Sequence, residues 1–177
     1  MSAYSIVPEI DVPTAAVVFL RERSVTCYRV SVPRGKGIDK SAAESSAWAA
    51  LGGDIPHVQP FSAEGADIIG VSSTEWWQVE CKGSGSGKPQ TQRNNFDRAL
   101  ASAVSHYEEK PANLPKKYPH YIGARPYLGL ALPASPAYLN ELKRRVRQPL
   151  RRALNLWILL YEPESKSIMA LSPEDSY

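Results

Sequence analysis

The stretch ADIIGVSSTEWWQVECK, residues 66–82, contains two candidate strands and the most conspicuous polar residues of the chain. "ADIIGV" is an apolar run of strand length, "SST" is typical of a turn, and "EWWQVECK" is a second extended run. Since successive side chains of a strand point to opposite faces, Glu80 and Lys82 share one face and Cys81 lies on the other. We therefore expect two neighbouring strands that bring Asp67 close to Glu80.

The segments around this stretch predict a single α/β domain over residues 1–177, with a central mixed sheet flanked by helices. N-terminal to it, we expect strands within residues 15–32 and an alanine-rich helix in "IDKSAAESSAWAALGG", which two glycines end. C-terminal to it, the pattern predicts a helix in residues 88–110, a strand in "PYLGLAL", a helix that begins at Ser135–Pro136 and is kinked at Pro149, and strands within residues 156–171. The apolar stripe expected for the 88–110 helix consists of Phe96, Leu100, Ala103, Val104 and Tyr107.

Composition excludes several classes of protein. Lys and Arg exceed Asp and Glu by only 21 to 18, so the net charge alone does not indicate a nucleic-acid-binding protein. Two cysteines provide neither a disulfide framework nor a zinc-knuckle spacing. We find no signal-peptide pattern and no apolar run long enough to cross a membrane, which predicts a cytoplasmic protein.

Three acidic residues are candidate metal ligands. Asp67 interrupts an apolar strand beside the strand of Glu80, and carboxylate oxygens are ligands that Mg²⁺ or Mn²⁺ prefers. Glu44 shares a predicted helix face with Trp48 and Leu51, so it is expected to be partly buried. The ordinary alternatives are a turn-capping Asp67, a surface ion pair between Glu80 and Lys82, and a Glu44 at the edge of its helix.

The glycine-rich loop "KGSGSGK" is not a nucleotide-triphosphate loop. Lys82 stands where the first glycine of G-x-x-x-x-G-K-[ST] belongs, and Pro89 follows Lys88 where Ser or Thr is needed. A basic loop rich in backbone amides, beside carboxylates, still suits the phosphate backbone of a polynucleotide.

The order of Glu44 on a helix, Asp67 on a strand and "VECKG" on the next strand resembles the PD-(D/E)XK nuclease superfamily, in particular its Holliday-junction-resolvase and Mrr-like branch. The motif core spans about residues 35–160, and Ala66 replaces the proline of the family name. The resemblance implies a restriction-endonuclease-like αβββαβ core and a Mg²⁺- or Mn²⁺-dependent endonuclease that hydrolyses phosphodiester bonds in DNA. Asp67, Glu80 and Lys82 would be catalytic.

The resemblance also implies the surroundings of that site. Asp67, Glu80, the main-chain carbonyl of Cys81 and Glu44 would hold the metal, and Gln90 or Gln92 would supply the assisting amide that some relatives carry. Nucleic acid would contact Lys88, Arg93, Arg144, Arg145 and Arg147, although an arginine-rich helix is equally well explained as a solvated face. Specificity would come from a homodimer or from a larger DNA-processing or defence complex.

Two alternatives remain open at this stage. The first is a catalytically inactive nuclease-fold module that binds DNA or a protein partner. The second is an unrelated α/β domain with a coincidental motif. The geometry of Asp67, Glu80 and Lys82 distinguishes them best, because only an active site requires these three residues to converge.

Overall fold

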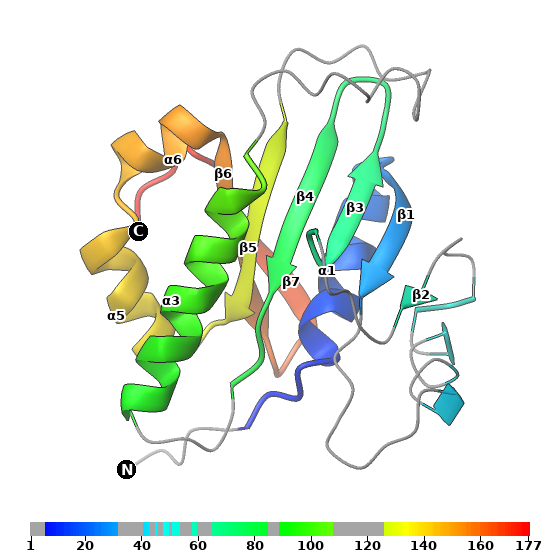
Figure 1. Cartoon of the computed structure of the whole chain (residues 1–177), viewed down its shortest axis with the longest axis horizontal. Coiled ribbons are helices and arrows are strands. Elements are labelled where there is room, and N and C mark those ends of the chain that lie inside the picture. Colours follow the sequence, from blue (N-terminus) through cyan, green and yellow to red (C-terminus); the bar gives the residue numbers. More distant parts are fainter. Residues whose placement is uncertain are drawn as a thin grey trace.

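The described residues form one mixed β-sheet with helices on both of its faces (Figure 1). The computed structural model describes residues 6–31, 41–42, 45, 48–49, 51–53, 58–59, 65–84, 89–107 and 126–177. The strands within these ranges are β1 (Thr26–Ser31), β2 (Val58–Gln59), β3 (Ile68–Val71), β4 (Trp76–Cys81), β5 (Tyr127–Pro133), β6 (Leu156–Glu162) and β7 (Ser167–Leu171). The predicted α/β class, with a mixed sheet flanked by helices, is therefore confirmed.

The strand order is β2-β1-β3-β4-β5-β6-β7. The centre of the sheet is parallel, because β5 pairs in parallel with both β4 and β6. Strands β1, β3 and β4 are joined by antiparallel pairs, and β7 adds to β6 in the same way. The strands predicted within residues 156–171 are thus present as β6 and β7. A parallel centre buried on both faces explains the nearly continuous apolar sequences of β5 and β6.

The N-terminal segment corrects one prediction. Of the strands expected within residues 15–32, only β1 is a strand, whereas the "AVVFL" part belongs to helix α1 (Asp11–Glu22). Val12, Ala16 and Leu20 recur every four residues and are completely buried against one face of the sheet. This packing outweighs the strand preference of the β-branched residues, which is weak and depends on context.

The opposite face of the sheet is covered by α3 (Pro89–Ser105), α5 (Pro136–Arg145) and α6 (Gln148–Leu154). Phe96 and Ala103 of the predicted stripe are buried, but Tyr107 is 38% exposed because α3 ends before it. Ser135 caps α5 as predicted, since its Oγ accepts from Tyr138 N at 3.4 Å. The expected kink at Pro149 is a break between two helices. Within the described ranges, none of the helices combines the length and apolar character needed to cross a bilayer.

The alanine-rich segment is only partly described. Residues 41–42, 45 and 48–49 are helical, and Gly53 N donates to Trp48 O at 3.0 Å, so the glycines end this helix as predicted. Gly53 has a φ of +77°, which a glycine adopts without a steric penalty. Leu51 is buried, whereas Trp48 is 46% exposed, so only one of these two residues of the predicted buried face is buried. Glu44 lies outside the described residues.

Candidate functional site

Asp67 lies at the start of β3, directly across from the end of β4. Ile68 pairs with Val79 in this antiparallel ladder, and the same register continued by one residue places Asp67 opposite Glu80. The Asp67 Oδ2 atom accepts a hydrogen bond from Cys81 N at 2.8 Å, and its main-chain oxygen accepts one from Ser31 N at 2.6 Å. Asp67 thereby connects β1 to β4, and the two predicted carboxylates lie on one face of the sheet.

Lys82 follows β4 and contacts an acidic residue that the sequence did not suggest. Its Nζ donates to Glu9 Oε1 at 2.5 Å, and its main-chain N donates to Ala131 O of β5 at 3.0 Å. Glu9 belongs to the segment that leads into α1. The end of β4 is therefore held between β5 and the N-terminal segment, with the Lys82 ammonium paired to a carboxylate.

Gly83 permits this close crossing of the N-terminal segment. A Cβ at position 83 would lie 2.7 Å from Glu9 Cα and 2.8 Å from Val7 O, both closer than real contacts. Val7 and Ser84 pair on either side of the crossing, since Ser84 N donates to Val7 O at 3.2 Å and Val7 N donates to Ser84 Oγ at 2.9 Å. The glycine after the predicted E-x-K motif therefore has a steric role in placing Glu9.

The carboxyl group of Asp67 is electrostatically unusual. Burial, together with the nearby Glu80 carboxylate, raises its pKa to about 7, although the Cys81 amide and the Lys82 ammonium oppose the shift. Glu9 acts in the same direction as Glu80. Burial and the Asp67 and Glu80 carboxylates also raise the pKa of the Cys81 thiol well above its ordinary value. The thiol therefore stays protonated at neutral pH, and Cys81 can contribute only its main-chain groups.

Glu80 is approached by the end of α3. The Nε2 atom of His106 lies 3.5 Å from Glu80 Oε2, and both side chains are mostly buried. The His106 main-chain oxygen accepts from Gln78 Nε2 at 2.8 Å, and Ser102 Oγ lies 3.4 Å from His106 Nε2. Gln78 and Glu80 share a face of β4, and His106, directly after α3, contacts both of them.

The donor set fits a hard divalent cation by its chemistry. Carboxylate oxygens and a main-chain carbonyl are ligands that suit Mg²⁺ or Mn²⁺, and a buried carboxyl with a raised pKa is ionised readily by a cation beside it. Among the described residues, however, no group of three or more His, Cys, Asp or Glu side chains is placed so that it could hold a metal ion. The predicted fourth ligand, Glu44, is not among these residues.

The predicted assisting amides occupy other places. Gln90 Nε2 donates to Asn94 Oδ1 at 3.0 Å on the exposed surface of α3, and Gln92 lines a pocket between α3 and α5. The polar group that reaches Glu80 from α3 is instead His106. His106 lies far from the E-x-K motif in the sequence, so the motif did not indicate this contact. Its position near the end of the helix that follows E-x-K is the signal that could have indicated it.

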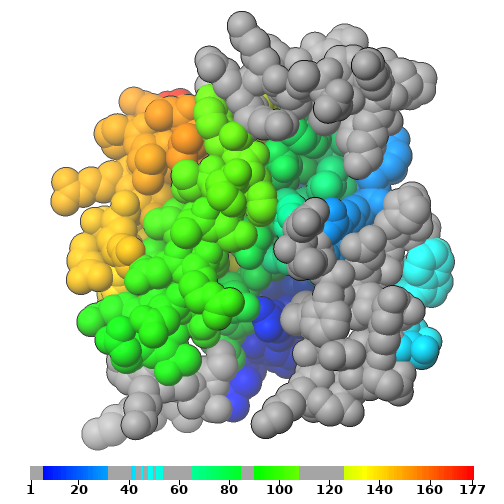
Figure 2. All heavy atoms as spheres, viewed as in Figure 1, coloured from blue at the N-terminus to red at the C-terminus, as the bar shows by residue number. Residues whose placement is uncertain are grey.

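Three of the predicted nucleic-acid-binding arginines gather around one carboxylate. Arg93 of α3 and Arg144 and Arg145 of α5 lie 3.5, 2.6 and 3.4 Å from Glu141, and Arg145 also pairs with Asp97. Figure 2 shows that α3 and α5 form a continuous part of one surface of the molecule. Arg147 is exposed between α5 and α6, and Lys88 is outside the described residues.

The remaining arginines of this region differ in exposure. Arg151 of α6 is completely buried, and its guanidinium donates to the main-chain oxygens of Ser172 and Asp175. The Arg151 guanidinium therefore binds main-chain oxygens inside the fold and is not part of the exposed basic surface. Arg152 is exposed and lies 2.7 Å from Glu174.

Comparisons with known proteins add no family to this description. No family model, curated protein or solved structure matches the chain.

Proposed function

We propose that the chain is a metal-dependent endonuclease that hydrolyses phosphodiester bonds in DNA. The observation that carries the proposal is the convergence of Asp67, Glu80 and Lys82 at the adjoining ends of β3 and β4. Asp67 responds electrostatically to both of the other residues, so the three form one cluster.

The order of elements supports the same proposal. If the two-residue β2 and the helical residues at 41–49 are taken as insertions between β1 and β3, the series α1, β1, β3, β4, α3 and β5 follows the αβββαβ order of a restriction-endonuclease-like core. In this assignment α1 is the first helix, in place of the helix predicted near residues 39–51. The acidic residue that accompanies the first helix is then Glu9, whose contact with Lys82 places it beside the cluster.

Asp67, Glu80 and the Cys81 carbonyl would hold a Mg²⁺ or Mn²⁺ ion, and the Glu9 carboxylate, which adds to the negative charge around Asp67, would attract it. Such an ion, when bound, polarises the phosphate and lowers the pKa of a coordinated water. A cation bound beside the Asp67 carboxyl would lower its pKa from about 7 and keep it ionised at neutral pH.

The remaining residues of the site would position and neutralise charge. Lys82 carries a compact positive charge on a flexible stem, which suits contact with a phosphate oxygen that becomes more negative during the reaction. Glu9 holds that ammonium near the end of β4. His106 lies against Glu80 and would keep its carboxylate oriented toward the cluster.

A cleavage assay tests the proposal directly. Wild-type protein, Asp67→Ala and Glu80→Ala should be compared on duplex, branched and single-stranded DNA with Mg²⁺, Mn²⁺ or EDTA. Glu164→Ala, which removes an exposed carboxylate from the turn after β6, is the control variant. We expect metal-dependent cleavage by the wild type and the control, and none by the two site variants. Binding of DNA without cleavage by the wild type would favour the inactive-module alternative.

A further inference from the structure

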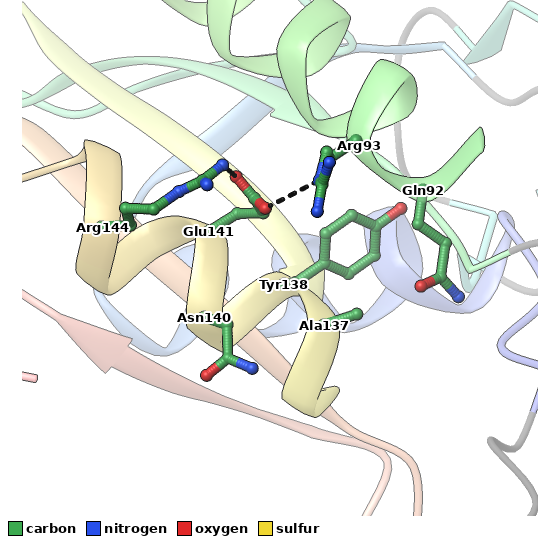
Figure 3. A pocket seen from close by; sticks show the side chains of 7 residues that line it. All are labelled: Gln92, Arg93, Ala137, Tyr138, Asn140, Glu141 and Arg144. Atoms are coloured by element: carbon green, nitrogen blue, oxygen red, sulfur yellow. Dashed lines mark hydrogen bonds and ion pairs between the residues drawn. The ribbon is translucent and has the colours of Figure 1, made fainter. Parts of the chain in front are cut away.

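A pocket lies between α3 and α5, and one of its lining residues, Tyr138, is hydrogen-bonded to Gly83, the residue after Lys82. Its cavity volume is about 310 Å³, and its lining residues come from the first part of α3 and from α5: Gln92, Arg93, Ala137, Tyr138, Asn140, Glu141 and Arg144 (Figure 3). Small-molecule sites begin at about this size. The ring of Tyr138 is buried in the pocket wall, and the two amides and two guanidinium groups belong to less buried residues.

The lining has the chemistry that recognises a nucleobase. Amide side chains can donate and accept at the same time, so Gln92 and Asn140 match the mixed edges of bases. Glu141 is an acceptor for exocyclic amino groups and also holds Arg93 and Arg144 at 3.5 and 2.6 Å. A carboxylate at this point disfavours a bare phosphate inside the pocket, whereas arginines at the rim suit the phosphates on either side of a bound base.

The pocket wall is attached to the strand end that carries Lys82. Tyr138 Oη donates to Gly83 O at 3.0 Å, and Gly83 directly follows Lys82 in the chain. A nucleic-acid strand with one phosphate at Lys82 would therefore have a neighbouring nucleotide beside this pocket.

We propose that this pocket binds an unpaired nucleobase of the DNA strand that occupies the active site, and that the enzyme therefore prefers single-stranded or locally unpaired DNA. This inference rests on the nuclease function proposed above. A base inside a duplex reaches such a pocket only after it is unstacked and unpaired, which costs free energy that an unpaired base does not need to supply.

Binding without metal separates this inference from catalysis. Glu80→Gln protein in EDTA is titrated into a fluorescein-labelled single strand, and separately into the matched duplex. The same titrations are repeated with two pocket variants of the Glu80→Gln protein. One variant also carries Gln92→Ala and Asn140→Ala, and the other carries Ala137→Phe, which fills the pocket. Asn94→Ala is the control, because it removes an exposed amide of α3 that does not line the pocket. Thermal melting shows whether each variant is folded.

We expect both pocket variants to weaken single-strand binding by about tenfold and duplex binding by less than about twofold. The control should bind both probes as the parent does. Unchanged single-strand affinity in both folded pocket variants overturns the inference, and so does an equal loss for strand and duplex. If the pocket variants show the selective loss but the wild-type protein, with Asp67 and Glu80 intact, cuts no DNA, the pocket inference is supported and the proposed catalysis is overturned.

Discussion

The Lys82 ammonium donates to the Glu9 carboxylate across 2.5 Å, joining the end of β4 to the segment that precedes α1. Both side chains are about one-third exposed, so the pair contributes little to stability, about 1 kcal/mol or less. Its importance is local. It places a third carboxylate within the electrostatic reach of Asp67 and fixes the position of the only lysine in the cluster among the described residues.

Glu9→Gln tests whether this carboxylate belongs to the site. We expect cleavage to fall by about tenfold or more at low Mg²⁺ and to recover in part at high Mg²⁺, because the cluster loses a negative charge that attracts the cation while the side-chain shape is kept. The melting temperature should change little. The measurement is cleavage rate against Mg²⁺ concentration. A rate equal to that of the wild type at every concentration would remove Glu9 from the site.

Asp67→Asn tests the raised pKa. The folded-state pKa of about 7 lies above the ordinary value of 3.8, so the folded protein holds this proton more tightly than the unfolded chain. Its contribution to the free energy of unfolding is complete below about pH 4, falls as the pH rises, and levels off above about pH 7. Asp67→Asn, which keeps an oxygen to accept from Cys81 N, should remove this loss and be more stable than wild type at pH 8 without metal.

Urea unfolding in EDTA at about pH 5 and pH 8 measures the effect. We expect the free energy of unfolding of the wild type to fall, relative to that of Asp67→Asn, by on the order of a few kcal/mol from about pH 5 to about pH 8. Glu164→Gln, which neutralises an exposed carboxylate, should keep the pH dependence of the wild type. A parallel pH dependence in wild type and Asp67→Asn would contradict the assigned pKa.

The pair of strands around Asp67 and Glu80 was predictable because its signals are local. Alternating faces, a turn between two runs and the pairing of neighbouring strands together imply the Asp67–Glu80 proximity. Glu9 was not predictable in this way, since 73 residues separate it from Lys82 and only the tertiary fold brings them together. His106 is similar, because its distance to Glu80 depends on how α3 packs on the sheet.

Two errors in the sequence interpretation have physical causes. The "AVVFL" run suits a strand by composition, but its buried Ala16 and Leu20 continue a four-residue repeat that begins at Val12, outside the run. The arginine-rich helix was expected either to contact nucleic acid or to be a solvated face, and neither interpretation anticipates the burial of Arg151. The arginines of α5 are partly neutralised by Glu141, whose spacing of three and four residues from Arg144 and Arg145 is the signal that reveals the pairing.

Arg151→Met should destabilise the protein by about 2 to 3 kcal/mol. The guanidinium donates to Asp175 O at 3.0 Å and to Ser172 O, and it lies 4.9 Å from the centre of the Tyr177 ring, so its loss frees the C-terminal residues from α6. Arg152→Met is the matched control, because the neighbouring exposed pair with Glu174 contributes about 1 kcal/mol or less. Chemical denaturation of both variants decides the matter, and equal stabilities would show that the buried contacts contribute nothing.

His106→Ala should reduce cleavage by about tenfold, since the Glu80 carboxylate loses the side chain that lies 3.5 Å from it. His106→Gln retains a nitrogen donor of comparable reach and should recover much of the rate. The informative measurement is the apparent Mg²⁺ affinity of each variant, because a merely structural loss would lower the melting temperature without changing that affinity. Equal Mg²⁺ dependence in the Ala variant, the Gln variant and the wild type would leave His106 without a role in positioning Glu80.

Lys82 and the arginines of the α3–α5 surface should separate catalysis from binding. Lys82→Ala should slow cleavage by about 100-fold or more, because the positive charge nearest the reacting phosphate is lost. It should weaken DNA binding little, since one phosphate contact is a small part of the total electrostatic attraction.

Arg93→Ala combined with Arg144→Ala should do the reverse. It should weaken binding to all sequences and reduce the salt dependence by about one unit of slope for each lost phosphate contact. Arg152→Ala, whose partner is Glu174, is the charge-matched control. Affinity for one DNA strand is measured over a series of salt concentrations, and the cleavage rate is measured at saturating protein. A Lys82→Ala protein that cuts at the wild-type rate would exclude the proposed mechanism, whereas an unchanged salt slope in the arginine variant would make that surface an ordinary solvated one.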